Sequence, residues 1–263
     1  MPASLRIAQV APPLERVPPE AYGGTERVVY ELITELVRRG HDVTTFASGD
    51  SDVPGRLVPT VPKALRPAGF GADPSGFILG TMVSVLDRDD EFDLIHSHLE
   101  WPSVMLARAT AVPVVATFHG RLDLPWATQL FESPPPRAAM VAISESQASA
   151  NPEVDWTVVH NGLTLTRAPF ERRRSDDLCF VGRVSPEKGI VEAIEIARRS
   201  GRHLRIAAKV GTTPDEAAYN ENVFEPARNA AGSRVEYLGE LSGRERDQLF
   251  ATSYATLMPG SWP

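Results

Sequence analysis

Short apolar runs alternate with amphipathic segments along almost the whole chain, and this rhythm limits the possible folds more than any other feature. Residues 5–11 are typical of a buried strand, residues 26–39 of a helix and residues 41–47 of a second strand. In the helical segment apolar residues recur at i, i+4 and i+8. Arg38, Arg39 and Gly40 then suit a helix C-terminus. Repeated strand–helix–strand units predict an α/β fold with parallel strands.

The same rhythm predicts two domains. Residues 77–86 are expected to form a helix, residues 48–75 a loop, and further strands are expected at 93–96, 113–118, 139–143 and 157–160. Ser144 and Gln147 form an S-x-x-Q pattern that predicts a capping box. After the polar segment 163–176, strands are expected at 178–181, 204–208, 235–238 and 255–258, with helices at 187–200, 215–230 and 244–251. We therefore expect two doubly wound domains, at 1–165 and 177–263, joined by a linker at 166–176.

Composition excludes several classes of protein. The 263 residues are 42% hydrophobic and 23% charged, as in an ordinary globular protein. No stretch approaches the roughly 18–20 apolar residues of a membrane-spanning helix, and no secretory signal is visible, so a cytoplasmic protein is expected. The single cysteine, Cys179, excludes a disulfide framework.

The charge is unevenly divided. Residues 1–165 carry 12 lysines and arginines against 20 acidic residues, whereas residues 166–263 carry 15 against 14. The net charge of −7 argues against a nucleic-acid partner. The second part repels an anion less than the first does.

Gly23 and Gly24 lie between the first strand and the first helix. Glycines there allow a ligand to approach the backbone, and a helix N-terminus offers N–H groups to an anion. A tight turn that needs glycine explains the same residues equally well. The spacing is not the GxGxxG of dinucleotide-binding enzymes.

The segment Gly182 to Gly189 follows a strand and opens a helix. Arg183 and Lys188 could converge there on a diphosphate, and Lys209 ends the next strand. Two solvated surface cations are the alternative. Their position at a strand end and a helix start favours the diphosphate-binding role over the surface alternative. The spacing is not that of a P-loop.

His119 and Asp123 follow a buried strand. His119 could donate a hydrogen bond to a substrate and Asp123 could accept one from a hydroxyl. A histidine that closes a strand and an aspartate that caps a helix from residue 124 is the interpretation that this local sequence favours.

Two further clusters are most simply structural. His96, His98 and Glu100 alternate at a strand end and suggest either a metal site or a partly buried structural cluster. The second is favoured because no further ligand set is evident. The run Arg172 to Arg174 is expected to be solvated linker.

Several segments together resemble a retaining glycosyltransferase of family 4. They are YGGTERVVYELITELVRRGHDVTTFASGDS, FDLIHSHLEW, PVVATFHGRLD, VAISESQ, HNGL, LCFVGRVSPEKGIVEAIEIARRSG, LRIAAKV, VEYLGEL and LMPGSWP. The resemblance spans nearly the whole chain with the motifs in order. It implies a GT-B fold, in which two Rossmann-like domains face a cleft.

The resemblance also implies roles for single residues. Gly23 and Gly24 would lie near the donor phosphates, His119 beside the transferred sugar, and Arg183 and Lys188 at the departing diphosphate, with Lys209 as a helper. Other residues would lie on the acceptor side: Thr25, Asp123 and Ser144. The family implies a nucleotide-sugar donor and a sugar, lipid or small-molecule acceptor, with peripheral membrane contact left open. No metal or other cofactor is expected, because cations and a helix dipole stabilise the leaving charge.

The family pattern continues beyond GSWP with an E-P-F-G-type segment, so the second domain is expected to be incomplete and activity of this chain weak or absent. Two alternatives to a transferase remain, a non-catalytic binding fragment and a nucleotide-sugar epimerase of the same fold. The RVSPEKG and HGRLD segments favour the transferase over the epimerase.

Overall fold

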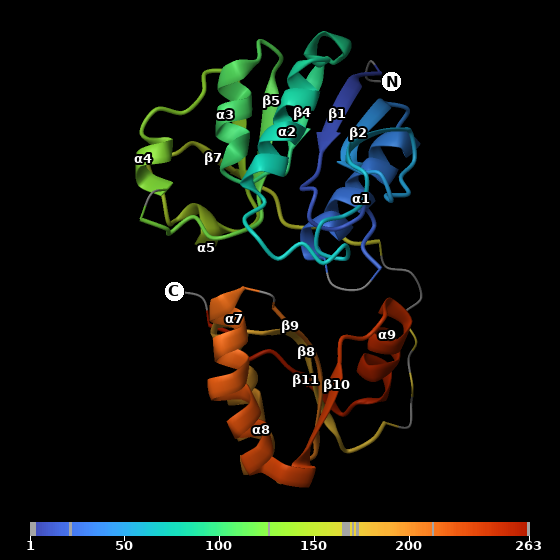
Figure 1. Cartoon of the computed structure of the whole chain (residues 1–263), viewed down its shortest axis with the longest axis vertical. Helices are drawn as coiled ribbons and strands as arrows, with labels where there is room; N and C mark the ends of the chain where they lie inside the picture. The colour runs from blue at the N-terminus through green and yellow to red at the C-terminus, as the bar shows by residue number, and fades with distance from the viewer. Residues whose placement is uncertain are drawn as a thin grey trace. The chain divides into compact units, whose positions relative to one another are not determined.

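The computed structural model describes residues 4–20, 23–125, 127–164, 169, 171, 174–211 and 213–261. The chain forms two compact units, one of residues 1–19 and 23–164, the other of residues 20–22 and 165–263 (Figure 1). Tyr22 of the first glycine motif, Arg172 and Arg173 of the expected linker, and the last two residues of GSWP lie outside the described residues.

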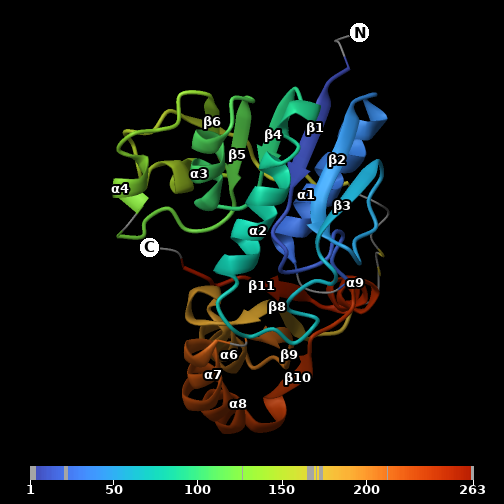
Figure 2. The same cartoon turned by 45° about the horizontal axis from the view of Figure 1, so that its top comes forward.

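The first unit is built on a parallel sheet. Within the described residues it has seven strands in the order β3-β2-β1-β4-β5-β6-β7, and Figure 2 shows β3, β2, β1, β4, β5 and β6 side by side. The strands are β1 (Arg6–Val10), β2 (Asp42–Ser48), β3 (Arg56–Val61), β4 (Leu94–Ser97), β5 (Val114–Phe118), β6 (Ala138–Ala142) and β7 (Trp156–Val158). The strand order reverses between β1 and β4, which pair with Gln9 opposite His96.

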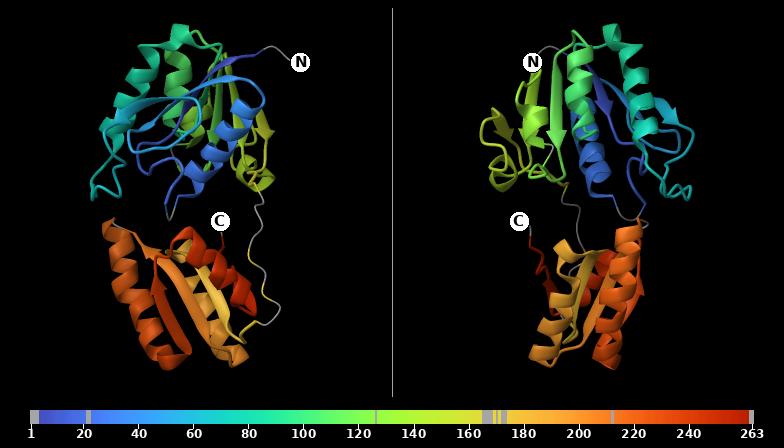
Figure 3. Two further views of the ribbon diagram at one scale, coloured as in Figure 1. Left: turned by 90° about the vertical axis from the view of Figure 1, so that its right-hand side faces the viewer. Right: turned by 60° about the vertical axis from the view of Figure 1, so that its left-hand side comes forward.

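Helices cover both faces of this sheet (Figure 3). They are α1 (Gly24–Arg38), α2 (Ser75–Leu86), α3 (Pro102–Ala109), α4 (Ala127–Phe131) and α5 (Glu145–Ala148), with a 3₁₀ turn, η1 (Asp89–Glu91). Helix α1 packs Val29 and Ile33 on one face against Val43 of β2. Helices α2 and α3 cover the other face.

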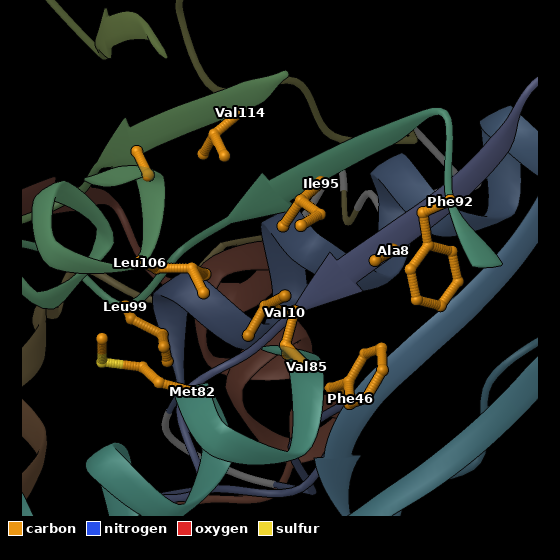
Figure 4. Packing of buried hydrophobic residues seen from close by; sticks show 11 residues of the cluster. Ala8, Val10, Phe46, Met82, Val85, Phe92, Ile95, Leu99, Leu106 and Val114 are labelled. Carbon is orange, nitrogen blue, oxygen red and sulfur yellow. The ribbon is translucent and has the colours of Figure 1, made fainter. Parts of the chain in front are cut away.

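The largest apolar cluster of the first unit lies between α2, α3 and the central strands. Figure 4 shows Val85 of α2 and Leu106 of α3 directed toward Val10 and Ile95, which lie on neighbouring strands. Phe46 is fully buried there and meets Phe92 edge to face at 5.8 Å between ring centroids. This packing holds β1, β2 and β4 in place and so fixes where their carboxyl ends lie.

The second unit has a smaller parallel sheet, with four strands in the order β10-β9-β8-β11 among the described residues. The strands are β8 (Leu178–Val184), β9 (Leu204–Val210), β10 (Val235–Gly239) and β11 (Ala255–Leu257). Around them lie η2 (Pro186–Lys188), α6 (Ile190–Ser200), α7 (Pro214–Tyr219), η3 (Asn220–Phe224), α8 (Glu225–Ala231), η4 (Gly232–Arg234) and α9 (Gly243–Thr252). Helix α9 packs Leu249 on Cys179 and Ala207, while Phe224 and Ile190 are buried against the opposite face.

Two expectations about secondary structure were wrong, and one helix was not expected. Residues 48–75 do not form only a loop, because β3 lies within them as the edge strand beside β2. An edge position tolerates Pro59, whose missing N–H weakens a strand signal. Helix α3 was not expected, although Pro102 in its first turn is a known start signal. The expected helix 215–230 is divided by the π turn η3, after which Pro226 lies in the first turn of α8.

Candidate active site

The predicted site residues of the first unit lie at the carboxyl end of its sheet. His98 directly follows β4 and His119 directly follows β5, while Gln9 lies near the end of the neighbouring strand β1. The strand order reverses between β1 and β4. Open α/β sheets bind ligands at the carboxyl ends of strands beside such a reversal.

Five polar side chains form a continuous hydrogen-bonded chain there. Gln9 contacts two imidazoles, His98 Nε2 at 3.1 Å through Oε1 and His96 Nδ1 at 3.3 Å through Nε2. His98 Nδ1 lies 3.0 Å from His119 Nε2, and His96 Nε2 lies 2.8 Å from Thr117 Oγ1. The rings of His96 and His98 stack with their centroids 4.3 Å apart. These contacts show the structural use of His96 and His98 that the sequence favoured.

Burial keeps these imidazoles neutral. It lowers the pKa of His119 to about 4, and burial with the nearby His119 lowers the pKa of His96 to about 4. Burial and the two neighbouring imidazoles hold the pKa of His98 well below its ordinary value. Near neutral pH each ring therefore has one N–H donor and one acceptor nitrogen.

Glu100 and Gln147 clamp the backbone around His119 from two sides. The Glu100 carboxylate accepts the N–H groups of His119 at 2.9 Å and Gly120 at 3.1 Å. Burial raises the pKa of Glu100 to about 7, against the opposing effect of these two N–H donors. Gln147 Nε2 donates to the carbonyls of Phe118 at 3.1 Å and Gly120 at 2.6 Å. His119 is therefore held at a fixed place beyond β5.

Ser144 is the N-cap of α5, and its hydroxyl accepts the N–H of Gln147 at 3.1 Å. The predicted capping box is incomplete, because Gln147 Oε1 accepts the N–H of Ile143 rather than that of Ser144. The amide N–H groups of Gln147 donate instead to the carbonyls of Phe118 and Gly120, on either side of His119. The expected acceptor-side residue Ser144 supports the His119 clamp through this cap.

We expect Ser144→Ala to cost about 1 kcal/mol of unfolding free energy, as loss of an N-cap does. Ser144→Asn keeps a capping oxygen and should retain most of that stability. Urea unfolding of both variants, with transfer assays beside them, separates the two roles. Equal losses of transfer in both variants at normal stability would show that the hydroxyl itself contacts the acceptor.

The two glycines at the start of α1 differ in their surroundings. Gly23 is buried at the N-cap, where a Cβ would lie 2.6 Å from Pro19 Cβ, so packing alone requires glycine there. Gly24 is exposed, and a Cβ there would meet no described atom within 4 Å. Thr25 is half-buried in the same helical turn. Gly24 is therefore the one of the two glycines that packing does not explain.

Asp123 does not cap a helix, contrary to the interpretation that its local sequence favours. Its carboxylate pairs with the Arg121 guanidinium at 2.6 Å, a bond that lowers the Asp123 pKa, and α4 begins only at Ala127. The two side chains lie on an exposed part of the loop after His119. Each carboxylate oxygen keeps a second lone pair, so Asp123 can accept from a hydroxyl while it holds Arg121.

A cavity of about 460 Å³ opens on the α1 face of the same sheet. Its walls come from α1, from β4, β5 and β6, and from the segment after β7. They include these residues: Glu31, Glu35, His96, His98, Thr117, Val141, His160 and Asn161. His96, His98 and Thr117 of the hydrogen-bonded chain therefore border a space large enough for a small molecule.

Arg183 lies near the carboxyl end of β8, and strand order reverses between β8 and β11. Its guanidinium contacts the carboxylates of Glu187 and Glu216, each at 3.1 Å. Its Nε is buried without a hydrogen-bond partner among the described residues. Burial raises the pKa of Glu187, but hydrogen bonds from Ser185 and Arg183 outweigh this and lower it.

The other two expected cations lie close to Arg183. Lys209 is its register partner across β8 and β9, and its Nζ lies 3.9 Å from the Glu240 carboxylate. Lys188 ends η2, and its side chain passes over Gly182, where a Cβ would lie 4.0 Å from Lys188 Cγ. The structure thus brings Arg183, Lys188 and Lys209 to one end of this sheet, with carboxylates balancing part of the charge.

Two glycines allow the segment before α6 to touch the segment after β11. Gly189 has a φ of 69°, and a Cβ there would lie 2.6 Å from the Pro259 carbonyl oxygen. A Cβ on Gly260 would lie 2.7 Å from the Glu187 carbonyl oxygen. The backbones of 187–189 and 259–260 therefore pack directly against each other.

We expect Gly189→Ala to lower the unfolding free energy of the second unit more than Gly201→Ala does. Gly201 has a similar φ of 67°, but a Cβ there would meet nothing within 4 Å among the described residues. Alanine at Gly201 therefore bears only the left-handed backbone cost of about 1–2 kcal/mol, whereas at Gly189 a collision with Pro259 adds to it. Urea unfolding of both variants measures the difference, and equal losses would contradict this.

Sequence reasoning missed Gln9, Glu187 and Glu216 as parts of these sites. Gln9 had a visible signal, because it is a polar residue inside an otherwise apolar buried strand. Glu187 had one too, because it lies four residues after Arg183 in the same motif. Glu216 had none, since it comes close only through the fold and also completes the capping box of α7. A Cβ on Gly211 would collide with the Glu216 carboxylate, so glycine makes room for it.

Comparison with solved structures identifies the fold class as that of GT-B glycosyltransferases. AviGT4, a glycosyltransferase of avilamycin A biosynthesis, aligns with a TM-score of 0.66 and 24% identity over 98% of this chain and 70% of its own. The catalytic domain of starch synthase IV from Arabidopsis thaliana, bound to ADP and acarbose, gives 0.67 and 14%, covering 99% and 79%. The UDP-GlcNAc 2-epimerase of Methanocaldococcus jannaschii gives 0.55 and 10%, covering 95% and 78%. At these identities the likeness shows the fold alone.

The sequence itself supplies the family. The model of Glycosyltransferase Family 4 matches residues 22–167, which is more than half of the chain. The chain therefore belongs to Glycosyltransferase Family 4, as the motifs predicted. A search of curated proteins found no match.

The described residues include neither a membrane-spanning helix nor a metal-binding cluster. None of their helices is both long and apolar enough to cross a bilayer. They also contain no group of three histidine, cysteine or acidic side chains arranged to hold a metal ion. His96, His98 and Glu100 therefore do not form such a group, because Glu100 is turned to the backbone of residues 119 and 120.

Proposed function

We propose that this protein transfers a sugar from a nucleotide-sugar donor to a hydroxyl acceptor, with retention at the anomeric carbon. The observation that supports this best is the cation cluster of Arg183, Lys188 and Lys209 beside the strand reversal of the second unit. A planar guanidinium suits a diphosphate, and two lysines add mobile charge.

In this proposal the cations act on the leaving group. The bond between the anomeric carbon and the phosphate oxygen breaks, and negative charge grows on the diphosphate. Arg183 and Lys188 stabilise that charge in place of a metal, as fixed cations do for developing anions. Glu187 and Glu216 contact only the two terminal nitrogens of Arg183, so the guanidinium keeps further N–H donors for the diphosphate.

The acceptor enters from the face that the leaving group vacates. Its hydroxyl oxygen bonds to the anomeric carbon, and its proton passes to the departing phosphate oxygen. Because bond making and bond breaking take place on the same face, the configuration is retained without a nucleophilic side chain. His119 lies beside the sugar and orients it through a hydrogen bond.

A panel of nucleotide sugars tests this proposal on the whole chain. Calorimetry measures binding, and NMR of the product measures transfer and anomeric configuration, with and without a chelator. Inverted product would refute the retaining mechanism, and loss of transfer with chelator would refute the metal-free leaving group. Absence of both binding and transfer for every donor would overturn the proposal. Binding without transfer would favour a binding module. An epimerised donor would favour epimerase activity, as in the 2-epimerase of similar fold.

A further inference from the structure

We propose that Gln9 and His98 are positioning residues for the proposed transfer: they fix His119 in its Nε2–H tautomer, so that Nδ1 accepts a hydrogen bond from a sugar hydroxyl. This inference rests on the proposed function for its substrate. Its structural part concerns the first unit only.

The direction of the hydrogen-bonded chain is set at Gln9. A primary amide has distinct ends, because its oxygen only accepts and its nitrogen only donates. Gln9 Oε1 faces His98 Nε2 and Gln9 Nε2 faces His96 Nδ1. His98 must therefore carry its proton on Nε2, and His96 must accept on Nδ1 and donate through Nε2 to Thr117.

The same logic passes from His98 to His119. A neutral His98 with its proton on Nε2 has an acceptor at Nδ1, and the atom 3.0 Å away is His119 Nε2. His119 Nε2 must then carry the proton. Gln9 is fully buried and His98 is 1% exposed, so water does not compete for these contacts.

This leaves the other nitrogen of His119 as an acceptor. No described residue bonds to its Nδ1, and the ring is half-buried at the carboxyl end of β5. The backbone on both sides of the ring is clamped by Glu100 and Gln147, so the ring has a fixed anchor. His119 therefore accepts from a ligand hydroxyl, whereas the sequence suggested that it donates.

The tautomer can be read directly by long-range ¹H–¹⁵N correlation NMR of the ¹⁵N-histidine-labelled chain at pH 7. Six histidines are present, and loss of one set of signals in His119→Gln assigns the ring. We expect the Nε2–H pattern for His119. The Nδ1–H pattern would overturn the proposal, because it requires the opposite direction of the whole chain.

Variants test whether Gln9 and His98 cause that tautomer. His98→Leu removes the acceptor and should leave His119 as a mixture of tautomers, whereas His98→Asn offers an oxygen and should keep Nε2–H. Gln9→Glu should keep His98 and His119 unchanged but switch His96 to Nδ1–H, because a carboxylate only accepts. A folded His98→Leu chain with an unchanged tautomer would contradict the positioning role. If that variant does not fold, the response of His96 in Gln9→Glu decides.

Donor analogues test the substrate part separately. If His119 accepts from one hydroxyl, replacing that hydroxyl by fluorine should lower kcat/KM about tenfold, as much as deleting it does, because fluorine cannot donate. Recovery of turnover by the fluoro analogue at every position that deletion affects would make His119 a donor and refute the inference. If the chain turns over no nucleotide sugar, the proposed function is refuted. The NMR experiment then still decides the tautomer of His119 independently.

Discussion

Replacing Arg183 and Lys188 together by alanine is expected to lower transfer by at least about 1,000-fold, because loss of one charge-stabilising donor typically costs about 10²–10³ in kcat. Arg183 places its guanidinium near the carboxyl end of β8, and Lys188 ends the turn η2 five residues later. Steady-state transfer with the donor identified from the panel measures the effect. Losses of this kind are not additive, so the single variants are measured as well.

Arg199→Ala is the matched control for this double variant. Arg199 lies on α6 in the same unit, 75% of its side chain is exposed, and its partner is Glu195. Transfer and stability should stay close to those of the unchanged chain. If the double variant kept transfer within about tenfold of the original while folded, the leaving-group role of Arg183 and Lys188 would be wrong.

The second large effect is expected on acidification, as a loss of stability of the first unit between pH 7 and pH 5. His96 and His119 have pKa values of about 4 in the folded chain against an ordinary 6.5. The unfolded chain therefore takes up protons first as the pH falls, and linkage gives a loss of roughly 2 kcal/mol for each. His98 acts in the same direction.

Glu100 opposes this trend. Its pKa of about 7 is raised above the ordinary 4.5, so the folded chain takes up that proton first and gains roughly 2 kcal/mol over the same interval. His96 and His119 against this one carboxyl leave a net loss of roughly 2 kcal/mol, to which His98 adds.

Urea unfolding at both pH values measures the net change through Trp156, which packs on Phe118 and Phe131 in the first unit. His119→Asn should reduce the acid-induced loss by roughly 2 kcal/mol. An unfolding free energy that is equal or higher at pH 5 would contradict the expected balance.

The strand–helix rhythm was enough to predict most of the fold, because buried parallel strands and amphipathic helices differ clearly in period. β3 escaped notice because an edge strand with Pro59 and exposed positions has neither pattern. Helix α3 was missed because its 8 residues are fewer than the roughly 11–18 over which a helical period shows, although Pro102 marks its start. Such elements depend on neighbours that are distant in sequence.

The sequence predicted where candidate side chains lie on the sheets but not their bonds. The positions of His119 and Arg183 at strand ends were predictable from the strand pattern. What each side chain contacts was not, since Glu216 reaches Arg183 from α7 and Gln9 reaches His98 from another strand. Asp123 shows the same limit, because its partner Arg121 was two residues away and still unrecognised.

The contact between Gly189 and Gly260 restricts how this protein could be re-engineered. At residues 187–189 the segment that runs on from Arg183 of β8 meets the segment after β11 as backbone against backbone, with no side chain between them. A loop taken from a relative to change donor choice would bring a different backbone path to 187–189 and press on residues 259–260. The two segments therefore form one exchangeable module, and a chimaera that replaces only one should fold less well than a chimaera that replaces both.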